Sequence, residues 1–333
     1  MTLRTPRWWY ARDPARGRLA RALLSPLAKI WTRATARRLA QGRPFDPGVP
    51  VICVGNLTVG GTGKTPVARE IARRLGADVL TRGYGGRLAG PVRVDPAHHP
   101  AADVGDEPLL LARDLPVWVA RDRAAGAAAA VAAGARLLVM DDGHQNPSVA
   151  KTLSLVVVDG ETREGEWPFG AEGVVPAGPL REPLDVGLAR ADAVVLMLPV
   201  EVTAADPTLL ARLAGKPILI ARLRPDGPPP SGPLVAFAGI GKPWKFERAL
   251  IAAGGEVGAM RAFPDHHAYT DAELSALAAE ADRLSGTLVT TEKDWTRLPA
   301  PWRDRITAWP VRAMFDDEAA LAALLPQGRA RPG

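Results

Sequence analysis

The chain has 333 residues, which is long enough for two domains of ordinary size, each with its own hydrophobic core. Hydrophobic residues make up 47% of it and charged residues 23%, a balance that excludes a largely disordered protein. No apolar run approaches the roughly 18 residues that a membrane-spanning helix requires. The single cysteine, Cys53, excludes an internal disulfide and is consistent with a reducing compartment.

The positive charge lies at the start of the chain, because residues 1–43 carry eleven Lys or Arg and one acid, whereas the rest carries 31 basic and 35 acidic residues. Within 1–43 the large apolar residues recur at helical spacing: Leu19, Leu23, Leu27, Ile30 and Trp31. We therefore predict a basic amphipathic helix. It could lie on an anionic membrane surface, or its apolar stripe could pack on its own domain. Pro26 is expected to kink or divide it.

From residue 44 to 225, short apolar strands alternate with helix-length segments, a pattern typical of a parallel sheet covered by helices on both faces. Strands are expected at 50–54, 78–81, 116–120, 136–140, 153–158, 193–198 and 217–221, and helices at 65–75, 107–114 and 122–134.

A Pro- and Gly-rich stretch at 224–233, "RPDGPPPSGP", is the expected linker. After it, strands are predicted at 234–238, 257–262 and 287–291, and helices at 244–253 and 271–285. The predicted fold class is α/β: a P-loop NTPase-like parallel sheet flanked by helices over 44–225, and a smaller α/β domain over 226–333 that closes over the site.

The segment "VICVGNLTVGGTGKTP", residues 51–66, is a strand that breaks into a glycine-rich turn before a helix. The pattern G-x-x-x-x-G-K-[ST] is matched except at its first glycine, where this chain has Thr58. Backbone N–H groups in such a turn, at the start of a helix, form a cradle for phosphates. The nucleotide-binding residues are predicted to be Thr58, Val59, Gly60, Gly61, Thr62, Gly63, Lys64 and Thr65.

Acidic residues follow the strand "RLLVM", where a P-loop protein needs a carboxylate for Mg²⁺. Asp141 and Asp142 stand at this strand end and are interpreted as metal or substrate contacts, with a surface turn as the alternative. Asp106 and Glu107 stand at a predicted helix start, where simple helix capping is the alternative to a role in chemistry. The sequence "VTTEKDW" resembles a guanine-reading motif, but its spacing fails, so a GTPase is disfavoured.

The motif "FPDHHAY" in the second domain places Asp265, His266 and His267 together. From the residues alone it could be a metal pair, a phosphoesterase-like motif or ordinary loop histidines.

Taken in order, "VGNLTVGGTGKTP", "TRGYGG", "VGDEPLLLA", "DDGHQN", "PAGPLREP", "FAGIGKP", "FPDHH" and "TEKDW" closely resemble the tetraacyldisaccharide 4'-kinase family, the lipid A 4'-kinases of Gram-negative bacteria. The resemblance implies an enzyme that uses ATP and Mg²⁺. It would phosphorylate the 4'-hydroxyl of a tetraacyl glucosamine disaccharide 1-phosphate to give lipid IVA. The family acts peripherally at the cytoplasmic face of the inner membrane, which favours the membrane interpretation of residues 1–43.

Carried over by motif, the resemblance assigns four catalytic residues: Lys64, Asp106, Arg181 and His266. Asp106 would be the base for the sugar hydroxyl, paired with a histidine of "FPDHH", for which we choose His266 over His267. Arg181 in "GPLREP" would contact a phosphate, with a solvated loop arginine as the alternative. The implied metal contacts are Thr65, Glu107, Asp141 and Asp142.

One departure from the family lies after "DDG", where the family usually has Phe-Gln-His and this chain has His144, Gln145 and Asn146. Either Asn146 takes the place of the family histidine as a neutral group, or His144 compensates.

A P-loop ATPase or metallochaperone switch is the alternative function, but one cysteine offers no metal-ligand spacing for it. A nucleic-acid partner is disfavoured by the acidic body of the chain, and no obligate protein partner is indicated.

Overall fold

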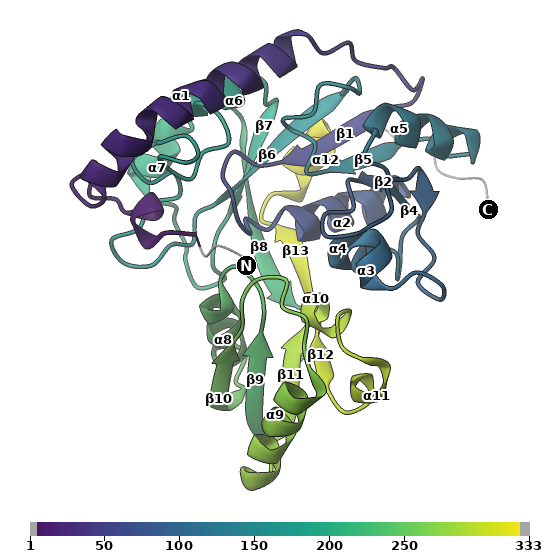
Figure 1. The fold of residues 1–333 in the computed structure, drawn as a ribbon, viewed down its shortest axis with the longest axis vertical. Coiled ribbons are helices and arrows are strands. Elements are labelled where there is room, and N and C mark those ends of the chain that lie inside the picture. Colours follow the sequence, from purple (N-terminus) through teal and green to yellow (C-terminus); the bar gives the residue numbers. More distant parts are fainter. Residues whose placement is uncertain (1–4, 327–333) are drawn as a thin grey trace.

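The computed structural model describes residues 5–326, which form a large and a small α/β unit (Figure 1). The large unit contains a nine-stranded sheet in the order β13-β8-β7-β6-β1-β5-β2-β4-β3. All neighbouring pairs are parallel except β3 with β4 and β13 with β8, at the two edges. The strands are β1 (Val51–Gly55), β2 (Asp78–Thr81), β3 (Val92–Arg93), β4 (Val117–Val119), β5 (Leu138–Asp141), β6 (Leu153–Asp159), β7 (Ala193–Met197), β8 (Ile218–Pro225) and β13 (Val311–Phe315).

Helices cover both faces of this sheet, as the unbroken apolar strands predicted. Successive side chains of a strand point to opposite faces, so Leu155 and Val157 of β6 join one core, whereas Val156 and Val158 join another. One face is packed by α2, α4 and α12, and the other by α5, α6 and α7. The helices of the large unit are α1 (Arg18–Ala40), α2 (Lys64–Leu75), α3 (Ala101–Val104), α4 (Asp106–Leu111), α5 (Arg123–Ala132), α6 (Leu184–Ala189), α7 (Pro207–Arg212) and α12 (Glu318–Leu324).

The small unit has a four-stranded parallel sheet in the order β10-β9-β11-β12. One face packs on α9 and the other on α8. Its elements are β9 (Pro233–Ala238), α8 (Pro243–Ala252), β10 (Glu256–Ala262), α9 (Asp271–Arg283), β11 (Thr287–Thr291), α10 (Glu292–Trp295), α11 (Ala300–Arg303) and β12 (Thr307–Trp309). The predicted α/β fold class with a second, smaller sheet is thus confirmed.

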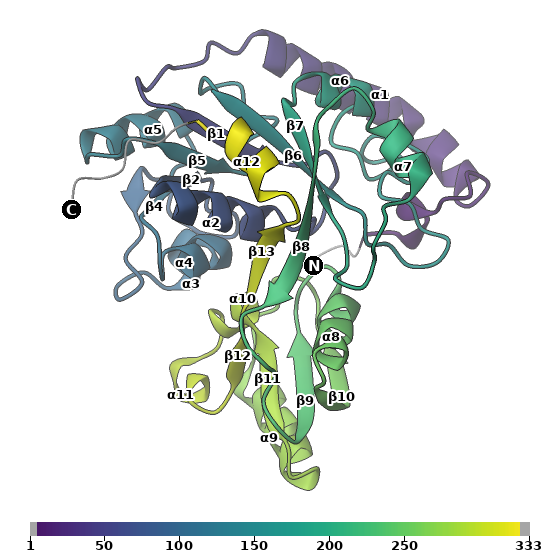
Figure 2. The ribbon, with the colours of Figure 1, turned by 180° about the vertical axis from the view of Figure 1, so that it is seen from behind.

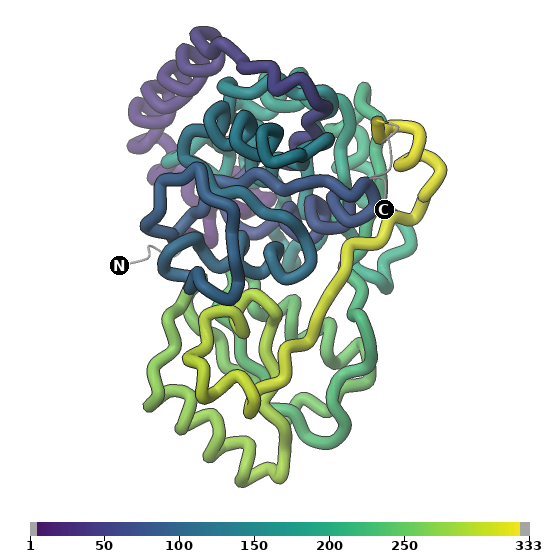
Figure 3. The backbone as a smooth tube through the Cα atoms, turned by 90° about the vertical axis from the view of Figure 1, so that its right-hand side faces the viewer, coloured from purple at the N-terminus to yellow at the C-terminus, as the bar shows by residue number. Residues whose placement is uncertain are grey.

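The end of the chain departs from the predicted division. After β12 the chain returns to the large unit, where β13 pairs antiparallel with β8 and α12 packs its Leu321 into the core beside α2. Figures 2 and 3 show this return beside β8. The predicted segment 226–333 is therefore shared between the two sheets, and two strands, β8 and β13, connect the units.

Residues 5–40, here called the N-terminal arm, contain a short 3-10 helix (Arg7–Tyr10) and α1. Pro26 does not divide the helix, contrary to one of the two expectations, because α1 continues from Arg18 to Ala40 with Pro26 inside it. A proline removes one backbone hydrogen bond, and the turns on either side keep the helix continuous. The arm lies along the edge of the large unit, near α6 and α7 (Figure 1).

Candidate active site

The glycine-rich turn joins β1 to α2, as predicted. Gly60 and Gly63 have left-handed backbone conformations, with φ of 92° and 88°, which residues with a Cβ rarely adopt. The Asn56 amide donates a hydrogen bond to the Thr62 hydroxyl at 3.1 Å, which closes the turn on itself. The N-terminus of α2 then begins at Lys64 and points its free N–H groups toward the turn. This geometry suits an anion held by backbone amides.

Thr58, the departure from the common motif, lies at the entry to the turn and is buried. Its carbonyl accepts a hydrogen bond from Arg181 Nε at 3.1 Å, and the neighbouring Leu57 carbonyl accepts from the Arg181 backbone N–H at 2.8 Å. The loop that carries Arg181 therefore fixes the entry through backbone contacts, so a threonine side chain is accommodated there.

Asp141 and Asp142 lie beside the turn because β5 pairs with β1, which places Asp141 opposite Val54. Thr65 donates its hydroxyl to Asp141 Oδ2 at 3.1 Å. Asp142 Oδ1 is 3.6 Å from Lys64 Nζ and 2.8 Å from Arg181 Nη1. The surface-turn alternative does not fit Asp141, which is buried, whereas Asp142 lies exposed in the turn after β5. Arg181 is ion-paired with Asp142, so it is not a freely solvated loop arginine.

The two aspartates differ in electrostatics. Burial and then the negative charge of Glu107 raise the pKa of Asp141 to about 7. Burial also acts to raise the pKa of Asp142, but Lys64 and Arg181 outweigh it and lower that pKa to about 2. Asp142 also has a left-handed backbone, with φ of 56°, at the sharp turn after β5. Asp142 is thus neutralised by Lys64 and Arg181, whereas Asp141 has no ion pair of this kind within residues 5–326.

The fit of a divalent cation can be tested on Asp141. Its Oδ1 is buried and has no hydrogen-bond partner among the described residues, and its Oδ2 faces the Thr65 hydroxyl. Oxygen atoms of this kind are the ligands Mg²⁺ prefers, together with phosphate oxygens and water. Within residues 5–326 no three acidic, imidazole or thiol side chains converge to hold a metal by themselves. Thr65 and Asp141 therefore suit an ion that arrives with a phosphate.

A second group of charged residues joins the two units. Asp106, at the start of α4, lies 3.0 Å from His266 Nδ1 and 3.0 Å from Arg297 Nε, both in the small unit. Lys293 of α10 lies 3.0 Å from Glu107 Oε1 and 3.9 Å from Asp106 Oδ2. Burial acts to raise the pKa of Asp106, but the His266 hydrogen bond and the two cations lower it to about 2. His266 has φ of 59°, an uncommon conformation that aims its ring at this carboxylate.

The two groups meet at the glycine-rich turn. A Cβ added to Gly241, in the motif "FAGIGKP", would lie 3.6 Å from the Gly61 nitrogen and 3.7 Å from Asp265 Oδ2. The small unit therefore lies directly against the turn. Beside this contact, Lys242 and Lys245 each lie 2.6 Å from the buried carboxylate of Asp159, at the end of β6.

Glu107 shares Lys293 with Asp106 and so belongs to this second group. Three other residues considered from the sequence lie apart from the Asp106 contacts. His267 faces Glu273 in its own unit, at 3.0 Å. His144 is buried, with its ring nitrogens 3.1 Å from Ser154 Oγ and 2.9 Å from the Gly187 carbonyl, so both nitrogens are engaged in the large unit away from Asp106. Asn146 accepts from the Ser148 backbone and hydroxyl and shapes a turn.

Three basic residues of this region were not predicted as site residues: Lys293, Arg297 and Arg123. The first belongs to "TEKDW", a motif that contributed to the family resemblance but was given no role at the site. Arg123 is buried close enough to Asp141 and Asp142 for their charges to act on it, and its Nε has no hydrogen-bond partner in the part of the chain that the structure describes. Only the motif spacing could have signalled Lys293, since a lysine on a short helix is otherwise unremarkable in sequence.

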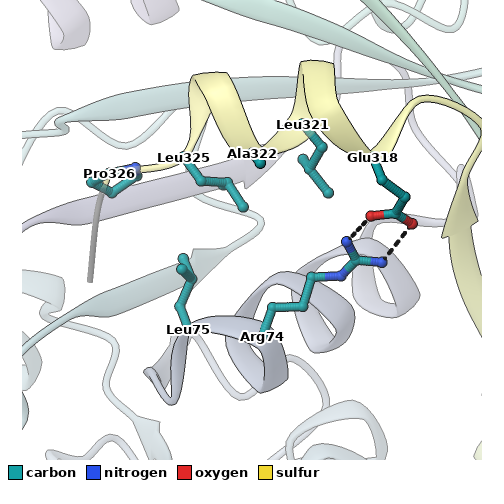
Figure 4. Close-up of a pocket in the computed structure, with 7 residues that line it drawn as sticks. All are labelled: Arg74, Leu75, Glu318, Leu321, Ala322, Leu325 and Pro326. Carbon is teal, nitrogen blue, oxygen red and sulfur yellow. Dashed lines mark hydrogen bonds and ion pairs between the residues drawn. The ribbon is translucent and has the colours of Figure 1, made fainter. Parts of the chain in front are cut away.

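A cavity of about 450 Å³ lies elsewhere, between the C-terminal half of α2 and α12, with Arg74, Leu75, Glu318 and Leu321 among its lining residues. Figure 4 shows its apolar walls and the Arg74–Glu318 ion pair at one end. Because the glycine-rich turn precedes the opposite end of α2, this cavity is not part of the site.

Comparison with known proteins identifies the family. The family model for tetraacyldisaccharide-1-P 4'-kinase matches residues 20–328. The chain belongs to the tetraacyldisaccharide 4'-kinase family. A tetraacyldisaccharide 4'-kinase of Phenylobacterium zucineum is 67% identical over 325 residues, covering 98% of this chain and 99% of the relative. One from Rhodospirillum centenum is 51% identical over 333 residues, covering 97% and 96%.

A solved structure of this family has the same fold. The crystal structure of the "apo" form of LpxK from Aquifex aeolicus in complex with ATP has a TM-score of 0.72 and 25% identity, covering 92% of this chain and 98% of that one. The present chain is accordingly a kinase of this family. Among the helices of residues 5–326, none is both long and apolar enough to cross a bilayer.

Proposed function

We propose that this family kinase transfers the γ-phosphate of ATP to the 4'-hydroxyl of a tetraacyl glucosamine disaccharide 1-phosphate, giving lipid IVA. One observation carries the residue assignment: the Asp106–His266 pair is made by both units, and the small unit touches the glycine-rich turn at Gly241. A phosphate in the cradle and a hydroxyl near this pair would therefore share one site.

The turn from Thr58 to Thr65 would hold the β- and γ-phosphates through backbone N–H groups. Lys64 and Arg181, which both contact Asp142, would also bind the phosphate oxygens. Thr65 and Asp141 would hold Mg²⁺, which neutralises the developing charge when bound. Glu107 is paired with Lys293 at 3.0 Å, so it would influence the ion through its negative charge near Asp141 and not by direct contact.

The hydroxyl proton would pass to the Asp106–His266 pair, with Asp106 as the base and His266 holding its carboxylate by the 3.0 Å hydrogen bond. Phosphoryl transfer has a loose transition state, so positioning of the acceptor contributes more than strong basicity. A carboxylate with a low pKa can therefore serve as the base, since its main task is to orient the hydroxyl and to receive the proton late in the transfer of the phosphoryl group.

The N-terminal arm supports a membrane-bound substrate. Its small residues Ala28 and Thr35 are buried, whereas Leu19, Leu23 and Ile30 are 81%, 80% and 61% exposed. This pattern opposes the interpretation in which the apolar stripe packs on its own domain. An apolar stripe with basic neighbours is suited to the interface of an anionic membrane. We propose that α1 docks peripherally on the cytoplasmic face of the inner membrane, where the acylated substrate lies.

The test uses purified full-length protein with ATP, Mg²⁺ and the tetraacyldisaccharide 1-phosphate in detergent micelles. Mass spectrometry should show a product heavier by one phosphate, and ATP consumption should require the lipid. ATP turnover at the same rate without lipid would favour the ATPase switch. Lys64→Ala, which removes one cation from the cradle, is the matched inactive control.

A further inference from the structure

The N-terminal arm makes two hydrogen bonds to the loops that form the phosphate cradle. Tyr10 donates its hydroxyl to the Val59 carbonyl at 2.5 Å. Trp31 of α1 donates its indole N–H to the Arg181 carbonyl at 2.9 Å. These residues are far from the glycine-rich turn in the chain, and membrane docking alone would not require either bond.

The Tyr10 contact acts on the orientation of the turn. The peptide between Val59 and Gly60 is planar and trans, so the Val59 carbonyl and the Gly60 N–H lie in one plane and point in opposite directions. The Tyr10 hydroxyl holds the Val59 carbonyl toward the outer side of the turn, and it therefore keeps the Gly60 N–H pointing toward the inner side. Gly60 has φ of 92°, and without the tyrosine this glycine would have wide conformational freedom.

The Trp31 contact acts on the other side of the cradle. Arg181 contacts the entry of the turn twice, since its backbone N–H bonds to the Leu57 carbonyl and its Nε to the Thr58 carbonyl. Its Nη1 also bonds to Asp142, which follows β5 beside the turn. A bond from α1 to the Arg181 carbonyl thus fixes the residue that organises this entry.

Tyr10 is itself firmly placed. Its backbone carbonyl accepts from the Trp167 N–H at 2.7 Å, and its ring lies 5.8 Å from Lys242 Nζ in the small unit. Burial and then the charge of Asp159 raise its pKa, so the hydroxyl stays a proton donor at all physiological pH values. The arm, the glycine-rich turn and the small unit therefore meet at one side chain.

We infer that Tyr10 and Trp31 are positioning residues through which the N-terminal arm sets the geometry of the phosphate cradle. The arm then has two tasks. The exposed apolar residues of α1 bind the membrane, a task that rests on the proposed function. The hydrogen bonds from Tyr10 and Trp31 hold the glycine-rich turn and Arg181 in the geometry that binds nucleotide. Nucleotide affinity should consequently depend on the arm even in the absence of any lipid.

The experiment measures binding of a non-hydrolysable ATP analogue with Mg²⁺ by calorimetry, using full-length Tyr10→Phe, Trp31→Phe and the double variant. Each substitution removes one hydrogen bond and keeps the aromatic ring. We expect about a fivefold loss of affinity for each, which is the usual effect of one lost hydrogen bond. Binding of the Tyr10→Phe protein to anionic vesicles should be unchanged, because Tyr10 lies outside the apolar stripe of α1.

Two controls make the outcome specific. Trp8→Phe alters an aromatic of the same arm that packs on Trp9 and Gly17, and it should leave analogue affinity unchanged. Leu23→Ala should weaken vesicle binding only. Hydrogen exchange of residues 57–63 should be faster in the Tyr10→Phe protein while the rest of the sheet is unaffected, which separates loop positioning from a general loss of fold.

Unchanged analogue affinity in the double variant would overturn the inference, as would an equal loss in Trp8→Phe. Because analogue binding needs no lipid, a failure here would leave the kinase function standing. Conversely, absence of lipid phosphorylation in the unmodified protein would not affect this result.

Discussion

Replacing Asp141 by Asn should stabilise the nucleotide-free protein while it removes activity. The carboxylate is buried, its Oδ1 has no hydrogen-bond partner within residues 5–326, and its pKa is raised from 3.8 to about 7. Each pKa unit is worth about 1.4 kcal/mol, so the ionised carboxylate costs the folded protein about 4 kcal/mol at alkaline pH. Asparagine has nearly the same shape and can still accept the Thr65 hydroxyl.

The sign and the pH window follow from the raised pKa. Between the ordinary value of 3.8 and about 7, the folded protein holds a proton that the unfolded chain has lost, so stability falls as pH rises. At about pH 5 the cost is only about 1.6 kcal/mol. The gain from Asp141→Asn should therefore be about 3 kcal/mol larger at about pH 8 than at about pH 5.

Urea unfolding at both pH values, without Mg²⁺, measures this difference. Asp142→Asn is the matched control of opposite sign, since Lys64 and Arg181 stabilise that carboxylate in its charged form. Mg²⁺ with an ATP analogue should cancel the advantage of Asp141→Asn by supplying the missing cation. A gain that is equal at the two pH values would refute the argument, because it would not come from ionisation.

Three further substitutions test other parts of the site. Asp106→Asn should lower kcat by a factor of about 100 or more, as loss of a catalytic base does, with ATP-analogue affinity retained, whereas His267→Asn should stay active in the same kinase assay. Asp159→Asn leaves two lysines of the small unit without the carboxylate they share, so thermal unfolding should show a loss of stability of about 3 kcal/mol. An unchanged unfolding temperature would show that this contact does not hold the units together. His144→Phe, which introduces the usual family residue, should cost about 1–3 kcal/mol in urea unfolding because Ser154 and the Gly187 carbonyl lose their partner, and an unaltered midpoint would contradict this.

Most of the fold could be predicted because its signals are local. Apolar strands of the large sheet alternate with helix-length segments, and β2 and β11 begin and end at the expected residues. The return of the chain at β13 could not be predicted in this way. Its residues Val311–Phe315 are half exposed and form an edge strand whose partner, β8, lies far back in the sequence. No periodic pattern encodes which sheet such a strand joins.

The site was predictable where one motif carries its own chemistry, and less so where contacts cross the units. The glycine-rich turn and Asp141 lie together because neighbouring parallel strands end at one edge of a sheet. The pairing of His266 rather than His267 with Asp106 depends on a left-handed backbone at residue 266. Adjacent histidines point in different directions there, and sequence alone does not specify which direction each takes.

The threonine at position 58 illustrates why a motif can lose a glycine and keep its geometry. A glycine is needed where the backbone is left-handed or where a Cβ would collide, and Thr58 is not among the residues with positive φ. Its carbonyl is fixed from outside by Arg181, and Arg181 is in turn bonded to Trp31 of α1. The entry of the cradle is thus set by two other segments of the chain instead of by the freedom of its own first residue. It follows that a glycine at 58 would add flexibility without adding a contact. Thr58→Gly should therefore leave the affinity for an ATP analogue, measured by calorimetry, unchanged or slightly weaker. A marked gain in affinity would mean that the threonine side chain obstructs the cradle.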